Sequence, residues 1–122
     1  MRLKSTSAIL LLISAFVCAL SIAQVPTISD TEASKYVGQQ VRVQGKVANV
    51  YTSKAGNRSV NFGRPYPDET FTAVIFAANS SKFPDPVQWS TRTVAITGTV
   101  KLYKGKPEII LTETSQLTEV KQ

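Results

Sequence analysis

The basic and aromatic residues of this 122-residue chain are the ones best suited to bind a ligand, and several of them lie in or near one stretch. The stretch VNFGRPYPDETFTAVIF, residues 60–76, contains two apolar runs joined by a polar turn in which Tyr66 lies between two prolines. Lysines and arginines can follow the phosphates of a single-stranded nucleic acid, and flat rings can stack on its bases. Eight residues therefore form a candidate nucleic-acid-binding set: Tyr51, Lys54, Arg58, Arg64, Tyr66, Tyr103, Lys104 and Lys106.

Ordinary structural roles compete with this interpretation. Pro65 and Pro67 stiffen the turn, so Tyr66 could either pack over the end of the fold or display its ring. The Lys-Gly-Lys sequence at 104–106 is also ordinary in a hairpin turn, with its charges in solvent. Five apolar residues nearby are better explained as core. Val60 and Phe62 share one face of one predicted strand, and Phe71, Ala73 and Ile75 share one face of the next.

Catalytic chemistry has little support in the sequence. The chain contains no histidine, which excludes the usual general base, the usual zinc ligand and any Ser-His or Cys-His pair. Phosphodiester cleavage would need carboxylates that hold a metal together, but Asp68 and Glu69 are adjacent and Asp85 lies between prolines. Neighbouring residues of a strand point to opposite faces. We therefore expect no catalytic residue, no metal site and no cofactor.

The N-terminus has the order of a secretory signal. It opens with MRLK and continues as an apolar run over residues 8–20, which falls short of the ~20 residues of a spanning helix. Ser21 and Ala23 favour cleavage before residue 24, and Val17 and Ala19 offer a second site. An uncleaved membrane anchor is the alternative. We expect a cleaved leader, residues 1–23, and an exported protein, periplasmic or extracellular, without a membrane span.

The remaining residues, 24–122, are enough for a single domain. The only cysteine lies in the leader, so packing rather than a disulfide must stabilise this domain. Of fourteen Lys and Arg residues, Arg2 and Lys4 lie in the leader, which leaves twelve against eight Asp and Glu. This moderate excess favours a polyanionic partner, although a solubilising surface charge explains it equally well.

The pattern after the leader is that of a short helix followed by strands. Residues 28–40 favour a helix of about two turns, with Ser29 or Asp30 as its cap and Gly38 at its end. Valines then alternate with polar residues, which is the period-two pattern of a half-buried strand. A segment with two prolines, 79–91, has room for one helical turn at most. Five strands are expected, at 41–51, 58–62, 70–78, 93–103 and 107–113.

Two of these strands have a glycine at the same place. V-x-V-x-G-K-V from residue 41 matches V-x-I-x-G-T-V from residue 94, so Gly45 and Gly98 correspond. A glycine weakens a strand unless the chain bends sharply or accepts a close neighbour there, and such bends let five strands coil into a closed barrel. An internal duplication would also explain the match. Phe83 and Trp89 are expected to close one end of the barrel. Its core should contain Val43, Val47, Ile96, Val100, Ile109 and Leu111.

The order of these motifs resembles an OB-fold. The resemblance is carried by VRVQGKVANVYTSKAGN at 41–57, VNFGRPYPDETFTAVIF at 60–76 and VAITGTVKLYKGKPEIIL at 94–111. More narrowly, residues 28–118 resemble small exported bacterial OB-fold proteins, similar to the OB-fold modules that accompany some secreted nucleases. The resemblance implies a mainly β fold, namely a five-stranded barrel with a short N-terminal helix and a short helical turn between strands three and four.

The resemblance also gives the candidate residues a place. Strands two and three of an OB-fold, flanked by the loops that join strands one to two and four to five, hold oligonucleotides or oligosaccharides. The hairpin at 60–76 would supply that face. We therefore expect an exported, non-catalytic module that binds single-stranded DNA or RNA weakly. The alternative is a domain that docks a protein or a cell-envelope glycan on the same face, with its positive charge incidental.

Overall fold

The computed structural model describes residues 24–121, and the predicted leader, residues 1–23, lies outside them. Within this range the protein is mainly β, with eight strand segments and four short 3-10 helices. In chain order these are β1 (Thr27–Ser29), η2 (Asp30–Tyr36), β2 (Gln40–Thr52), β3 (Arg58–Phe62), β4 (Phe71–Ile75), η3 (Ala77–Lys82), η4 (Pro86–Trp89), β5 (Thr93–Thr99), β6 (Lys101–Tyr103), β7 (Lys106–Ile110), η5 (Thr114–Gln116) and β8 (Leu117–Glu119).

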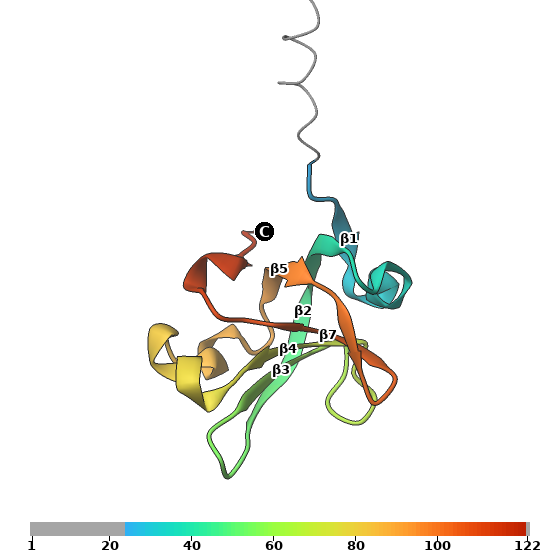
Figure 1. Ribbon diagram of the computed structural model, residues 1–122. Coiled ribbons are helices and arrows are strands. Elements are labelled where there is room, and N and C mark those ends of the chain that lie inside the picture. Colours follow the sequence, from blue (N-terminus) through green and yellow to red (C-terminus); the bar gives the residue numbers. More distant parts are fainter. Residues whose placement is uncertain (1–23, 122) are drawn as a thin grey trace, which may run out of the picture.

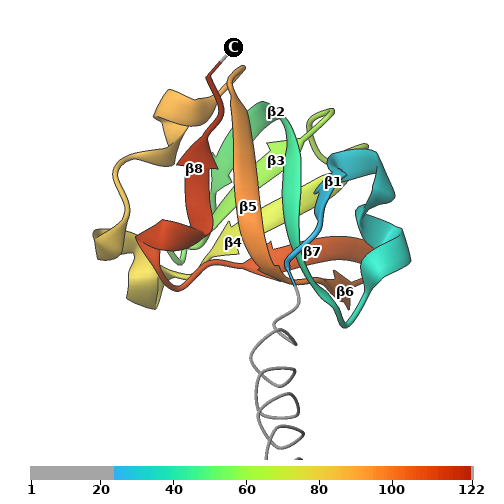
Figure 2. The ribbon, with the colours of Figure 1, turned by 90° about the horizontal axis from the view of Figure 1, so that it is seen from above.

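The long strand β2 connects two halves of one sheet. Its first half, from Gln40 to Lys46, pairs antiparallel with β5, and its second half, from Val47 to Thr52, pairs antiparallel with β3. β3 pairs with β4, β4 pairs in parallel with β7, and β7 pairs with β6. In Figure 2, β5 and β8 therefore lie in front of β3 and β4, and the two layers share one core.

The sheet curls into a barrel-like form. Its path of paired strands runs β6, β7, β4, β3, β2, β5 and β8, and β5 and β6 are successive parts of one stretch of chain, separated by Val100. The path therefore returns to the stretch from which it starts. Within residues 24–121, β7 is the only strand that pairs with β6, so the barrel stays partly open. The predicted mainly β, barrel-like architecture is thus confirmed, but the closed barrel expected from the sequence is not found among the described strands.

The hydrophobic core lies between the two layers. All six side chains predicted to share it are buried in one cluster, which confirms this part of the prediction. Phe62 and Phe71 are also fully buried, and their rings meet edge to face with centroids 5.2 Å apart. Phe83 and Trp89, between β4 and β5, join the same cluster. Phe62 and Phe71 of the central hairpin thus stabilise the fold rather than displaying their rings.

The number of strands differs from the prediction. β1 and β8 have three residues each, too few to show a recognisable period-two pattern. The predicted fourth strand is divided at Val100, which forms an isolated bridge with Val37 between the part that pairs with β2 and the part that pairs with β7. In place of one helical turn, η3 and η4 both occupy the segment between β4 and β5.

The N-terminal helix is a 3-10 helix of seven residues rather than an α-helix. It spans Asp30–Tyr36, so it is shorter than the predicted residues 28–40, but its cap at Ser29 and the glycine that follows it agree with the prediction. The backbone N–H of Ser29 donates a hydrogen bond to Oε1 of Glu32 at 3.0 Å, and Gly38 beyond the last turn has a φ of 86°. β1 comes directly before the helix and β2 begins at Gln40, so only about two tight turns of 3-10 geometry fit between the strands.

Gly45 and Gly98 lie where another side chain approaches the backbone, which is one of the two reasons expected for a glycine within a strand. A Cβ atom at Gly98 would be 2.6 Å from Cγ2 of Ile109, and one at Gly45 would be 2.7 Å from Oδ1 of Asp30. The Asp30 carboxylate also accepts a hydrogen bond from the hydroxyl of Thr70. The two glycines therefore let β5 approach β7 and let η2 hold the chain that enters β4.

Gly98→Ala should destabilise the fold by about 1–3 kcal/mol, because a methyl group placed against Ile109 overpacks the core. Urea unfolding followed by circular dichroism measures the change. Thr99→Ala is the matched control, since Thr99 is the exposed neighbour on the same strand. A Gly98→Ala variant with an unchanged free energy of unfolding would contradict the close approach of β5 and β7.

Candidate nucleic-acid interface

The eight predicted binding residues lie in two groups at opposite ends of β3. The strand has five residues, so the loop at its start, 53–57, and the turn at its end, 63–70, are roughly 17 Å apart. Tyr51, Lys54 and Arg58 lie at the first end. In Figure 1 the β3–β4 turn lies beside the β6–β7 turn, and the β2–β3 loop lies apart from both. The second end contains Arg64, Tyr66, Tyr103, Lys104 and Lys106.

Contacts of Lys106 join the two turns at the second end. Its ammonium group donates a hydrogen bond to the carbonyl oxygen of Pro67 and forms an ion pair with Glu69 at 2.8 Å. The same group is 5.9 Å from the ring centroid of Tyr66. Tyr66 is 75% exposed, so its ring is displayed rather than packed over the end of the barrel. Lys106 therefore positions the turn that presents Tyr66.

The β6–β7 turn presents a second ring. Tyr103 is exposed, and Nζ of Lys104 is 5.3 Å from its ring centroid. Lys104 and Gly105 have φ values of 51° and 81°, the left-handed conformations of a two-residue hairpin turn. This end of β3 thus combines two exposed tyrosine rings with nearby cations, which suits stacking of unpaired bases.

Ion pairs neutralise part of the predicted cationic set. Arg58 forms one with Asp85 at 3.4 Å, in addition to the pair that Lys106 makes with Glu69. These cations are less available to phosphates, because a ligand would have to compete with a carboxylate. Three predicted cations form no ion pair within residues 24–121: Lys54, Arg64 and Lys104.

A row of polar side chains crosses the outward-facing side of the sheet. Nδ2 of Asn61 on β3 donates to Oδ1 of Asn49 on β2 at 3.1 Å, and the Thr72 hydroxyl on β4 donates to Oδ1 of Asn61, also at 3.1 Å. Thr72 is in register with Glu108 on β7. We call the outward-facing side of β3, β4 and β7 the outer face, and Asn49, Asn61, Thr72 and Glu108 the polar row.

Sequence reasoning missed the polar row, although a signal for it was present. Asn61 stands between the core residues Val60 and Phe62, and Glu108 likewise precedes the core residue Ile109. A single polar residue between core residues of a strand must face outward. The pattern does not reveal that Asn61 and Glu108 are nonetheless buried, because burial depends on the residues that neighbouring strands place around them.

Glu108 is the acidic member of the polar row. Burial raises the pKa of its carboxyl group above the ordinary value, and Lys101 on β6, with Nζ 3.9 Å from Oε2, partly opposes this shift. The free energy of unfolding should therefore fall as the pH rises through that pKa, because Glu108 then becomes charged in a buried position. Within the described range its oxygens accept no hydrogen bond, yet neither is enclosed. The carboxylate is thus open to a donor from outside.

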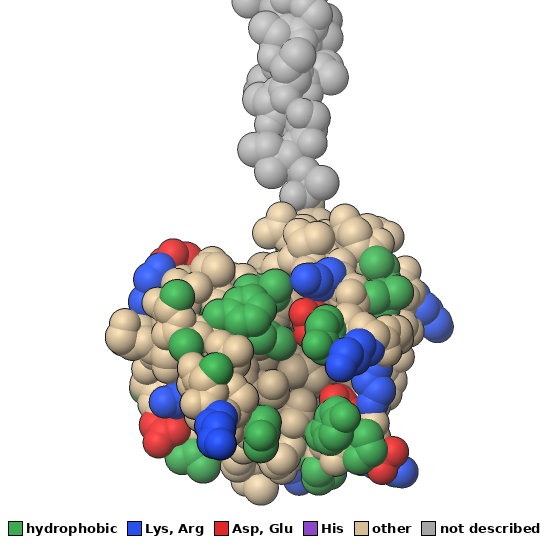
Figure 3. Space-filling model, turned by 60° about the horizontal axis from the view of Figure 1, so that its bottom comes forward, with side chains coloured by type: hydrophobic (Ala, Val, Ile, Leu, Met, Phe, Trp, Pro, Cys, Tyr) green, Lys and Arg blue, Asp and Glu red, His purple; other side chains and the backbone are tan. Residues whose placement is uncertain are grey.

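The underside of the molecule, where the loop and turns project, is shown in Figure 3. Hydrophobic and basic side chains stand on both sides of a hollowed region of other side chains and backbone. Large apolar side chains exposed on β2, β6 and the loops nearby include Tyr51, Tyr66, Phe76, Leu102 and Tyr103. The combination of exposed rings and cations is the pattern expected of a surface that contacts single strands.

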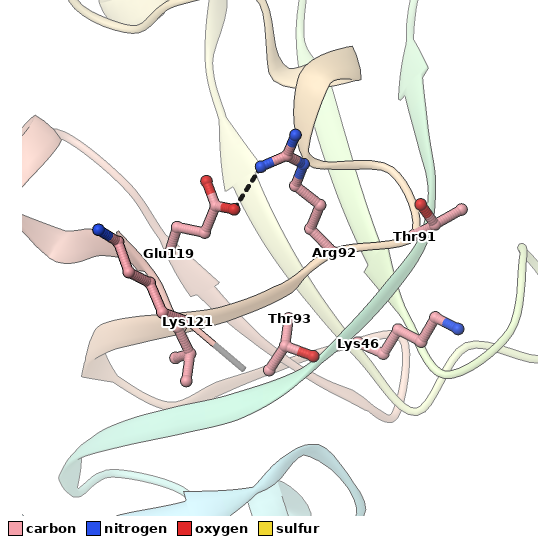
Figure 4. A pocket seen from close by; sticks show the side chains of 7 residues that line it. Lys46, Thr91, Arg92, Thr93, Glu119 and Lys121 are labelled. Carbon is pink, nitrogen blue, oxygen red and sulfur yellow. Dashed lines mark hydrogen bonds and ion pairs between the residues drawn. The ribbon is translucent and has the colours of Figure 1, made fainter.

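A depression of about 490 Å³ lies elsewhere, at β5 and β8. Its lining includes Lys46, Arg92, Glu119 and Lys121 (Figure 4). Arg92 is paired with Glu119, and the ammonium groups of Lys46 and Lys121 point in different directions. Because its basic groups do not converge, this depression is a weaker candidate for a binding site than the outer face.

Residues 24–121 contain no group of three or more acidic, histidine or cysteine side chains that could hold a metal ion. Of the carboxylates considered from the sequence, Glu69 and Asp85 each pair with a cation. In the same range, no helix has the length and apolar character needed to cross a membrane.

Comparisons with known proteins add evidence on the fold alone. No protein-family model matches the sequence, and no curated protein matches it. Among solved structures, an OBody bound to hen egg-white lysozyme aligns with a TM-score of 0.53 and 20% identity, over 84% of this chain and 100% of the OBody. A Leishmania major protein provisionally assigned as an aspartyl-tRNA synthetase aligns with a TM-score of 0.51 and 12% identity, over 90% of this chain.

The chain spans only 25% of the length of that synthetase. A Klebsiella pneumoniae lipoprotein provisionally assigned as nucleic acid-binding aligns over 75% of this chain and 79% of its own, with 18% identity and a TM-score of 0.42. That score is too low to support an inference. The first two alignments show a shared fold at low identity, and the function must be argued from the residues of this chain.

Proposed function

We propose that the chain is an exported, non-catalytic OB-fold domain that holds single-stranded nucleic acid across its outer face. The observation that carries the proposal is the presence of exposed tyrosines and unpaired cations at both ends of β3 in the described structure. The pairing order supports the five-stranded OB barrel, with β2, β3, β4, the β5–β6 stretch and β7 as strands one to five. β1 and β8 are additions to that barrel.

The proposed path of the strand follows the geometry of the outer face. Its phosphates would contact Lys54 at one end and Arg64 and Lys104 at the other, because ion pairs occupy the remaining predicted cations. Its bases would stack on Tyr66 and on the other exposed tyrosines. Binding supported by few free cations should be weak and sensitive to salt.

The second candidate is a domain that docks a protein or an envelope glycan on the same face. Two observations favour it: β2, β6 and the loops around the outer face expose several large apolar side chains, and ion pairs reduce the charge of Arg58 and Lys106. The OBody that shares the fold is itself bound to a protein. A ligand held in this way would bind with little dependence on salt.

Export is proposed from the N-terminal sequence, whose basic start, apolar run and small residues have the order of a signal peptide. The mature protein would then be one OB-fold domain, residues 24–122. Intact-mass measurement of the protein secreted or released from the envelope should give a chain that begins at Gln24. Recovery of a membrane-bound chain that still contains Met1 would contradict cleavage.

The proposed function predicts salt-dependent binding of labelled single-stranded DNA and RNA by the protein that lacks residues 1–23. With three phosphate contacts at about 0.7 each, the slope of log K against log salt should be about −2. Fluorescence anisotropy at several salt concentrations measures it. Absence of salt-sensitive binding at tens of micromolar would contradict the proposal, since even non-specific binding has dissociation constants of about 10⁻⁴ to 10⁻⁶ M. Binding with a flat salt dependence would favour the second candidate.

The same titration tests the stacking role of Tyr66. Tyr66→Ala should weaken binding by about 1–3 kcal/mol if a base stacks on the ring. It should leave the free energy of unfolding nearly unchanged, because the ring is exposed. Tyr66→Phe is the matched control, since it keeps the ring and should keep the affinity. A Tyr66→Ala variant that loses stability but not affinity would assign the ring to the fold instead.

A further inference from the structure

Glu108 lies in an unusual position for an acid on a face expected to bind a polyanion. It is 8% exposed, and its nearest cation in the described structure, Lys101, is 3.9 Å away, beyond hydrogen-bond distance. A carboxylate so nearly buried ordinarily has hydrogen-bond donors around it, because burial without them is costly. Glu108 therefore has an unmet need for donors on the side that faces outward.

The rest of the polar row does not supply those donors. The Thr72 hydroxyl, which is in register with Glu108, donates to Asn61, and the Asn61 amide donates to Asn49. These bonds run away from β7 toward β2. Glu108 is thus left as an acceptor at the β7 end of the row, with the exposed ring of Tyr103 on the adjacent strand β6.

A carboxylate here also decides which part of a nucleic acid can approach. It repels phosphate, so a strand on the outer face must place its phosphates near Lys54, Arg64 and Lys104 and turn its bases toward the polar row. Unpaired bases present their Watson–Crick edges to a protein in this way. The part of the ligand that meets Glu108 is therefore the edge of a base.

Resting on the proposed function, we propose that Glu108 reads guanine by accepting hydrogen bonds from its N1–H and N2–H groups. Guanine offers two adjacent donors, which match the two oxygens of one carboxylate. Adenine and cytosine each offer one amino donor beside a ring nitrogen that is an acceptor, and thymine and uracil offer one N–H between two carbonyl oxygens. A desolvated carboxylate repels those acceptors, so guanine alone satisfies both oxygens.

The test compares heptamers of sequence TTTXTTT, in which X is guanine, adenine, cytosine or thymine, so that no run of guanines can form a quadruplex. The wild-type protein without residues 1–23 should bind the guanine heptamer about tenfold or more tightly than the thymine heptamer, as for one good bidentate contact. Glu108→Gln should abolish this preference, and the affinity for the thymine heptamer should not fall, because the substitution removes a negative charge that repels phosphate. Glu119→Gln is the control, because it removes one negative charge on β8, outside the outer face, and should keep the preference.

The possible results separate this inference from the function on which it rests. Equal binding of all four heptamers, or a guanine preference that survives Glu108→Gln, overturns the role of Glu108 and leaves the proposed function intact. Binding of no heptamer overturns both. Circular dichroism melting of each variant shows that a lost preference does not come from a lost fold, and Glu108→Gln should melt no lower than wild type because it removes a buried charge.

Discussion

The change of partner along β2 is the constraint on which the rest of the structure depends. One continuous strand of thirteen residues pairs with β5 in its first half and with β3 in its second. The exchange occurs beside Gly45, and the register with β3 shifts between Val47 and Asn49. A strand can serve two layers only if it coils, and a residue without a side chain together with a bulge permits that coiling.

The outer face follows from this change of partner. β3, β4 and β7 lie side by side because β2 leaves β5 in its second half and pairs there with β3. Asn61, Thr72 and Glu108 are next to core residues of their strands, so they point outward on neighbouring strands. The strand pairing thus brings the members of the polar row together. The polar row is therefore a product of the strand order as much as of its residue types.

Much of the fold could be predicted from local patterns. β3 has the predicted limits, Arg58–Phe62, because alternation and flanking turn residues define it. The predicted core was correct because side chains at every second position of a curled strand face inward. Gly98 was predicted from its place within a strand to mark either a bend or a close neighbour, and the structure shows the close neighbour, Ile109. β1 and β8 could not be predicted, since strands of three residues depend on a neighbour for their conformation.

The binding surface was less accessible to sequence reasoning. The residue types were enough to predict a set of cations and aromatic rings. For Tyr66 the sequence left two alternatives, a packed ring and an exposed ring, and the structure has the exposed one. The ion pairs of Arg58 and Lys106 join residues 27 and 37 positions apart, which no local pattern predicts. Glu108 was missed for a related reason: its burial, and the lack of a hydrogen bond to its carboxylate in the described structure, are both properties of the assembled sheet.

Ligand binding on the outer face is the proposal on which the others rest. A nuclear magnetic resonance titration of ¹⁵N-labelled protein without residues 1–23 with a short single-stranded oligonucleotide tests this claim. The amide resonances that shift should belong to β3, β4 and β7, to the loop at 53–57, to the turn at 63–70 and to the β6–β7 turn. Shifts confined to β1, β5 and β8, or to the depression around Arg92, would contradict the claim.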